Sequence, residues 1–126
     1  MLTEGLLALM NSCTPLTNIV GNRIYPVVLP KNYTVPAITF YVVTNKTDVA
    51  LDYTFASTDQ IEINVWANNY HDASYGQQAL HTLLDMYHGT LPDGTVVLFT
   101  SSHDNPDFFE KDSLLYRCST TFSFLH

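Results

Sequence analysis

A strict alternation of apolar and polar residues constrains the fold of this chain more than any other feature. It runs through Gln60-Ile61-Glu62-Ile63-Asn64-Val65. Successive side chains of a β-strand point to opposite faces, so the pattern predicts a strand over residues 58–67 with one apolar and one polar face. The same alternation returns between residues 114 and 125. Strands of this kind are typical of an antiparallel sheet that is covered on one face only.

The apolar period changes between residues 72 and 88. Here the apolar positions recur at spacings of three and four, at Gly76, Ala79, Leu80, Leu83, Leu84 and Tyr87. This spacing predicts an amphipathic helix that is ended by Gly89 and Pro92. Two shorter helices are predicted before it, over residues 3–12 and 14–20, because each has a Thr as N-cap and an apolar stripe.

The remaining segments complete an α+β pattern. Strands are predicted over residues 37–44 and 96–101, whereas the prolines of residues 23–30 favour an extended edge segment or connector. Residues 45–57 and 103–113 are polar and rich in turn-forming residues, so both are predicted to be loops. We therefore expect an α+β fold, an antiparallel (mixed) β-sheet of about four to five strands with helices packed on one face.

A chain of 126 residues has the size of one domain, so we expect a single domain over residues 1–126. Its core is predicted where the strand and helix periods both point inward. These positions are Ile61, Ile63, Val65, Leu80, Leu83, Leu84, Phe122 and Phe124. The two cysteines, Cys13 and Cys118, lie far apart without metal-type spacing, which predicts two buried free thiols.

Charge excludes one class of partner. Twelve carboxylates against five basic residues give a formal net charge of −7. Binding to a phosphate backbone needs clustered positive charge, so we expect no specific nucleic-acid binding by this chain. The first residues lack a basic segment, and no apolar run approaches the roughly 18 to 20 residues that span a bilayer. We expect a soluble protein, made in the cytoplasm, that makes no contact with a membrane.

Two patterns superficially suggest a metal site. His81, Asp85 and His88 are separated by four and three residues, so one helix face could bring all three to a divalent ion. Exposed histidines and carboxylates often share a helix face, and we favour a solvated face over a metal site. Residues 106–111 resemble an acidic nuclease motif, but Glu110 is adjacent to Lys111, and the alternation that such a site needs is lost. We expect no catalysis, cofactor or metal.

Two residues are candidate contacts with a partner. Trp66 falls on the polar face of its strand, where it either anchors a partner or packs under a loop at the end of the sheet. Arg23 follows Gly21 by two residues, where its charge either complements a helix C-terminus or meets a partner.

The early part of the chain resembles the phage tail-completion, or tail-terminator, family. The resemblance lies in Gly21-Asn22-Arg23-Ile24-Tyr25-Pro26, then Leu29-Pro30, then Pro36-Ala37-Ile38 through Phe40. It continues in the strand of residues 60–67, in Tyr70 near the start of the following helix, and in Leu115-Tyr116-Arg117 at the opening of the last strand. These blocks span most of the chain.

The resemblance implies a structural virion protein of the tail or neck, made in the host bacterial cytoplasm. Such a protein assembles as a hexameric ring on the tail tube, stops tube growth and joins the tube to the head connector, with no enzymatic activity. Its partners are further copies of itself, the major tail tube protein and the head connector or stopper protein, and DNA passes through its lumen. The alternative is a small α+β regulatory or ligand-binding module that forms a homo-oligomer.

The same ring model suggests which residues face partners. A closed ring needs two complementary patches on each subunit, and Trp66 and Arg117 lie on the polar sheet face. The carboxylates of the two predicted loops are candidates for the lumen, where negative charge would let DNA pass without binding. They are Asp48 and Asp52 in the first loop and Asp104, Asp107, Glu110 and Asp112 in the second.

Overall fold

The computed structural model describes residues 2–21, 23–49, 55–111 and 114–125. The described helices are α1 (Leu2–Ser12), α2 (Thr14–Val20) and α3 (Tyr70–Leu84). The described strands are β1 (Ile24–Pro26), β2 (Ala37–Val49), β3 (Phe55–Ala67), β4 (Gly89–Thr90), β5 (Val96–Val97), β6 (Phe99–Asp104), β7 (Phe108–Glu110) and β8 (Leu115–Leu125). None of the described helices is long and apolar enough to cross a bilayer.

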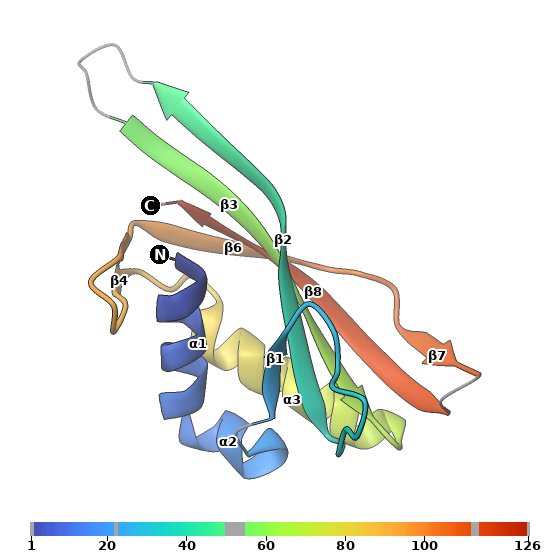
Figure 1. Cartoon of the computed structure of the whole chain (residues 1–126). Coiled ribbons are helices and arrows are strands. Elements are labelled where there is room, and N and C mark those ends of the chain that lie inside the picture. The colour runs from blue at the N-terminus through green and yellow to red at the C-terminus, as the bar shows by residue number, and fades with distance from the viewer. Residues whose placement is uncertain (1, 22, 50–54, 112–113, 126) are drawn as a thin grey trace.

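The main sheet is mixed and has the strand order β1-β2-β3-β8-β6, with β7 paired to the start of β8. β1 runs parallel to β2, and the other neighbours are antiparallel. β4 and β5 form a separate two-stranded sheet. The helices lie on one side of the main sheet (Figure 1). The predicted α+β class with helices on one face is confirmed, and the main sheet contains six of the described strands where about four to five were expected.

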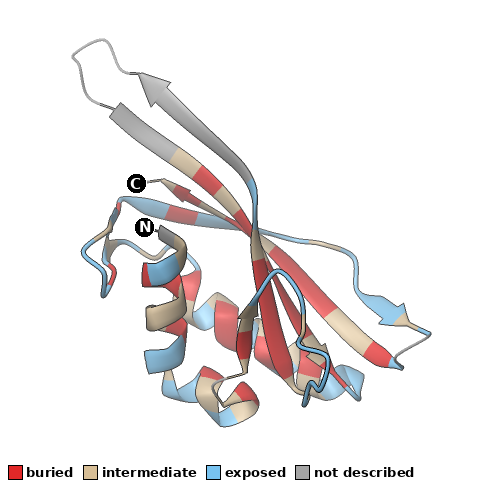
Figure 2. Ribbon diagram, in the orientation of Figure 1, coloured by how far each residue is buried: buried red, intermediate tan, exposed pale blue. Residues whose placement is uncertain are grey.

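The core lies between α3 and the middle of the sheet. Seven of the eight predicted core residues are buried, and the eighth, Leu83, is partly buried against the same cluster. Leu6, Met10, Leu16 and Val20 extend the core into α1 and α2, so all three helices contribute to it. Buried residues concentrate in the central strands of the sheet and in the helices beside them (Figure 2).

The cysteines differ from one another. Cys118 is buried, as predicted, and its burial together with the nearby charge of Asp107 raises the pKa of its thiol to about 12. Such a thiol is unreactive at neutral pH because the thiolate is the nucleophile. Cys13 is only half-buried, at the start of α2, and packs on the edge of the core.

The predicted loop over residues 45–57 was wrong. β2 extends to Val49 and β3 begins at Phe55, and the two strands pair along their length as a long hairpin, while residues 50–54 lie outside the described residues. β3 pairs with β8 only from Thr58 onward. In the described part of the chain, the outer end of this hairpin is therefore a two-stranded ribbon that extends beyond the sheet (Figure 1).

The predicted loop over residues 103–113 also contains strands. β6 continues to Asp104, and β7 pairs with the beginning of β8. The strand expected over residues 96–101 is instead divided between β5 and β6. Along residues 23–30, only Ile24–Pro26 form a strand.

The main helix begins and ends earlier than the predicted range of 72–88. Its N-cap is Asn69, whose side chain accepts a hydrogen bond from the Asp72 amide at 2.8 Å. It ends at Leu84 because the chain then turns toward β6, where the Met86 amide donates to the Thr100 carbonyl at 3.1 Å. This contact with β6 replaces the last helical turn that the apolar period predicts.

Candidate functional site

One face of the main sheet is not covered by any of the described helices and presents a row of large side chains. Trp66 of β3 pairs with Arg117 of β8, and Phe108 of β7 pairs with Arg117 from the other side. Directly opposed residues on neighbouring strands share a sheet face. Trp66, Arg117 and Phe108 therefore form a row across three strands, which we call the Arg117 row.

The two aromatic rings hold the guanidinium between them. The Arg117 Cζ atom lies 5.8 Å from the centroid of the Trp66 ring and 5.1 Å from that of Phe108. Both distances are within the range of cation–π attraction. Trp66 is itself fixed, because its indole Nε1–H donates to Thr39 Oγ1 at 2.9 Å. Phe108 was not among the predicted candidates, although an exposed Phe108-Phe109 pair in an acidic segment is the signal that could have found it.

The same face carries a second polar group two rows away. Glu62 accepts hydrogen bonds from the Tyr41 hydroxyl and from Asn64 Nδ2, the latter at 3.1 Å. The bond to Glu62 and partial burial raise the pKa of Tyr41, and the positive charge of Arg117 opposes the rise. Asn64 is buried, and no hydrogen bond to its Oδ1 is found among the described residues.

Arg23 lies elsewhere, beside β1 at the opposite edge of the sheet from the Arg117 row. Its Nε donates to the Pro36 carbonyl at 2.9 Å. Its Nη1 lies next to Gly21, the C-cap of α2, since a Cβ added to that glycine would be 3.3 Å away. This position suits the helix C-terminus interpretation of Arg23, in which the cation complements the helix dipole.

Asp104, Asp107 and Glu110 are the candidate carboxylates whose side chains the structure describes, and they have different surroundings. Asp107 accepts a hydrogen bond from the Tyr70 hydroxyl at 2.6 Å, and Glu110 lies in β7. Asp104 points to the helix side of the sheet. The backbone of Asp48 belongs to β2, while Asp52 and Asp112 lie outside the described residues.

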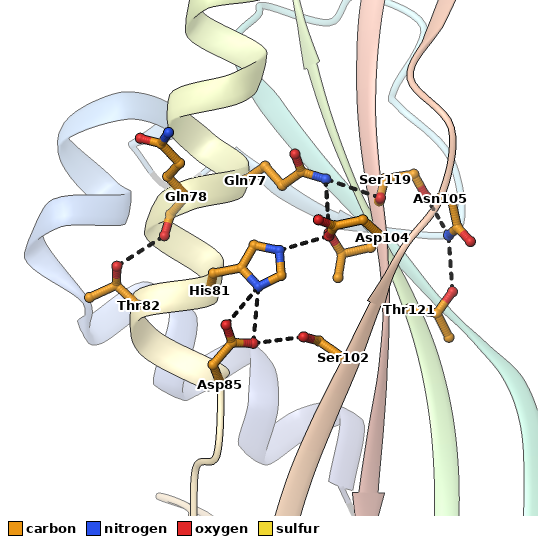
Figure 3. A network of polar contacts seen from close by, with 11 residues as sticks. Gln77, Gln78, His81, Thr82, Asp85, Ser102, Asp104, Asn105, Ser119 and Thr121 are labelled. Atoms are coloured by element: carbon orange, nitrogen blue, oxygen red, sulfur yellow. Dashed lines mark hydrogen bonds and ion pairs between the residues drawn. The ribbon is translucent and has the colours of Figure 1, made fainter.

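Asp104 instead belongs to a polar network that joins α3 to β6 and β8 (Figure 3). His81 Nε2 lies 2.7 Å from Asp104 Oδ1, and His81 Nδ1 lies 2.9 Å from Asp85 Oδ2. Further bonds extend it, from the Ser102 hydroxyl to Asp85 at 2.8 Å and from the buried Thr120 hydroxyl to Asp104 at 2.8 Å. We call these residues the His81 network, together with Gln77, whose Nε2 donates to Thr120 at 3.0 Å.

The protonation state of His81 follows from its two partners. Both are carboxylates that only accept hydrogen bonds when ionised, and an imidazole donates through both nitrogens only when it is protonated. Burial lowers the pKa of His81, but the bonds to Asp85 and Asp104 and their charges outweigh it and raise the pKa overall. Burial correspondingly raises the pKa of Asp104, but the bonds from Thr120 and His81 outweigh it and lower the pKa.

Of the face that was expected to be solvated, Asp85 and His88 are exposed, whereas only 25% of the His81 side chain is exposed and both of its nitrogens are bonded. The ring also lies 5.8 Å from that of Phe122 in the core. His88 lies beyond the end of α3, and its Nδ1 faces the Met86 carbonyl at 3.4 Å. The described residues contain no group of three potential ligands that could hold a metal ion.

An open apolar groove of about 410 Å³ lies between α1 and the edge of the sheet that is formed by β1 and β2. It is lined by Thr3, Glu4, Leu7, Pro26, Val27, Phe40, Tyr41 and Val42. Val27 is 63% exposed and has a φ of 68°, an unusual conformation for a β-branched residue. At this residue the chain leaves β2, so the β2 edge beyond Phe40 has no strand beside it in the described structure.

No protein-family model matches the sequence, and no curated protein matches it either. The structure is nevertheless similar to a chain in the virion of a native gene transfer agent particle, with a TM-score of 0.72. The similarity covers 93% of this chain and 87% of that chain, at 15% sequence identity. At this identity, the similarity shows that the two chains share a fold over nearly their whole lengths.

Proposed function

We propose that this chain is a non-enzymatic structural subunit of a phage-like virion, of the tail-completion type. The observation that carries the proposal is the fold shared with a virion chain over 93% of the residues. The sequence blocks around Arg23 and Arg117 support the finer assignment, because they resemble the tail-completion family at both ends of the chain. In this role the protein occupies the tail or neck of the particle, caps the tail tube and joins it to the head connector.

The surfaces of the subunit suit assembly into a ring, and the family resemblance implies a hexamer. A closed ring of identical copies uses two different surfaces on each subunit. The Arg117 row crosses β3, β8 and β7, whereas the apolar groove lies at the edge formed by β1 and β2, so the subunit offers two separate candidate surfaces. Exposed valines flank the groove, and exposed apolar side chains in patches are typical of protein contacts.

Particle morphology tests this function. We expect particles made without the protein to carry overlong tails or tails that are not joined to heads, as seen by electron microscopy. Complementation with the wild-type gene is the control. Normal particles that lack the protein would exclude this role.

The groove favours a second candidate, a small ligand-binding module that forms a homo-oligomer. Its volume lies within the range of about 300 to 1,000 Å³ that is typical of small-molecule sites. Leu7→Trp would fill the groove from α1. A ligand-binding module would carry a small molecule as the wild-type protein and lose it in this variant. A purely structural subunit would carry no small molecule in either form. Native mass spectrometry of the purified proteins distinguishes the two results.

A further inference from the structure

Arg117 is oriented, but it has no polar partner among the residues that the structure describes. Trp66 and Phe108 hold the guanidinium at the distances given above. Its Nε is buried, and no hydrogen bond or ion pair reaches this side chain among the described residues. Glu62, a carboxylate on the same sheet face, is engaged by Tyr41 and Asn64. The guanidinium is therefore positioned without a hydrogen-bond acceptor among the described residues.

The chemistry of the missing partner follows from the guanidinium. Its donors lie in one plane and form a fork that matches the two oxygens of a carboxylate. Aromatic rings engage the face of a cation and leave its in-plane donors available. Half-burial between two rings also reduces screening by water, so an ion pair at this position is stronger than one on an open surface.

Charge indicates where this carboxylate comes from. Each copy has a formal net charge of −7, so copies that approach one another in an assembly repel except where a cation on one meets a carboxylate on the next. The guanidinium of Arg23 is already committed to the Pro36 carbonyl. Arg117, in contrast, is a positioned cation on the sheet face that the described helices leave uncovered.

We propose that Arg117 binds a carboxylate side chain of a second copy of this chain, with Trp66 and Phe108 as the walls of the site. The contact is of the head-to-tail type, in which the arginine surface of one copy meets a different, acidic surface of the next. The inference rests on the proposed function only in that a ring supplies the neighbouring copy. It adds the residue and the chemistry that join the copies.

Self-association in solution tests the contact. NMR spectra of isotope-labelled protein are recorded as unlabelled wild-type protein is added, and the Arg117 Nε–Hε and Trp66 Nε1–Hε1 signals are followed. We expect both signals to shift with concentration and the shift to diminish with added salt. An Arg117 signal that is independent of concentration would overturn the proposal without the need for any variant.

Three variants sharpen the test. Arg117→Glu is expected to weaken self-association by about tenfold or more, because it opposes like charges at a desolvated contact. Arg117→Lys keeps the charge but loses the planar fork, and an intermediate loss is expected. Lys31→Glu makes the same change in net charge at an exposed loop position and is expected to behave as wild type. Equal association of Arg117→Glu and Lys31→Glu would overturn the proposal.

A mixing experiment checks the head-to-tail geometry. Arg117→Glu protein keeps its acidic surface, so it should bind the Arg117 of a labelled wild-type copy and shift that signal.

Particle incorporation separates this inference from the proposed function. Normal assembly with Arg117→Glu would remove the inference and leave the function standing, whereas wild-type protein that self-associates through Arg117 but is absent from particles would remove the function alone.

Discussion

Gly76 of α3 lies directly against Val65 of β3, so closely that a Cβ added to the glycine would be 2.5 Å from Val65 Cγ1. Real Cβ atoms do not approach other carbons so closely, and Val65 is fully buried and cannot move aside. The glycine therefore sets how near the helix comes to the sheet. This spacing positions the whole of α3, including His81 five residues further along.

Gly76→Ala is therefore expected to destabilise the protein by about 1 to 3 kcal/mol, even though alanine is the better helix former. Urea denaturation of the variant would measure the loss. In the Val65→Ala background the added methyl group finds space, so the same change should cost less there. A stabilised Gly76→Ala single variant would contradict the packing described here.

Two neighbouring leucines of α3 should differ in their contribution to the free energy of unfolding. Leu80 is fully buried, and its replacement by alanine is expected to cost about 2 to 5 kcal/mol. Leu83 is only partly buried, so Leu83→Ala should cost clearly less. Denaturation midpoints measured side by side would test the order, and equal losses would mean that α3 is rotated.

The His81 network should make stability depend on pH. The raised pKa of His81 stabilises the folded state fully below its ordinary pKa of 6.5, and this contribution is lost as pH rises through the raised value. The lowered pKa of Asp104 contributes above its ordinary 3.8 and is lost as pH falls through the lowered value. The two effects together are largest between these ordinary pKa values.

His81→Gln should consequently be less stable than wild type by about 1 kcal/mol at about pH 5.5, with a smaller difference at about pH 9. The exposed His88 provides the control, since the free energy of unfolding of His88→Gln should be close to that of wild type at both pH values. Urea denaturation at the two pH values is the measurement. A pH-independent effect of His81→Gln would mean that the imidazole is neutral in the folded protein.

Metal ions should not bind at this network, because both nitrogens of His81 already face carboxylates and His88 lies apart from it. We expect calorimetric titration with Zn²⁺, Mn²⁺ and Mg²⁺ to show no tight binding. Micromolar Zn²⁺ affinity that disappears in His81→Ala would contradict this arrangement.

If the subunit forms the proposed ring, some of its acidic surface should line the path of DNA. Glu110→Lys is the cleanest probe among the described carboxylates, because Asp104 and Asp107 also hold internal hydrogen bonds. We expect normally assembled particles with this change to eject DNA more slowly, since positive charge retains phosphates, and salt to restore the rate. Ejection at the wild-type rate would assign Glu110 to the outside of the ring.

Sequence periodicity predicted the parts of the fold that face the core. The alternation of Ile61, Ile63 and Val65 predicted which face of β3 is buried, because burial on one face imposes a period of two. The outer half of the hairpin escaped prediction for the same reason. At residues 47–49 and 55–57 the two strands pair only with each other in the described structure, and strands with no core to cover need no apolar alternation.

The polar sites were harder to predict because they depend on tertiary contacts. His81 and Asp85 share a helix face at a spacing visible in the sequence, but Asp104 joins them only because β6 pairs with β8 beside α3. Likewise, Arg117 was a candidate from the sequence, whereas the role of Phe108 depends on the pairing of β7 with β8.

The position of β8 has a consequence for how the protein is made. It follows every other described element in the sequence, yet it lies inside the sheet, between β3 on one side and β6 and β7 on the other. Until this strand leaves the ribosome, the backbone edges of its three neighbours remain open to other chains. The sheet can therefore close only after β8 has been made, and until then the unpaired strands are exposed to aggregation.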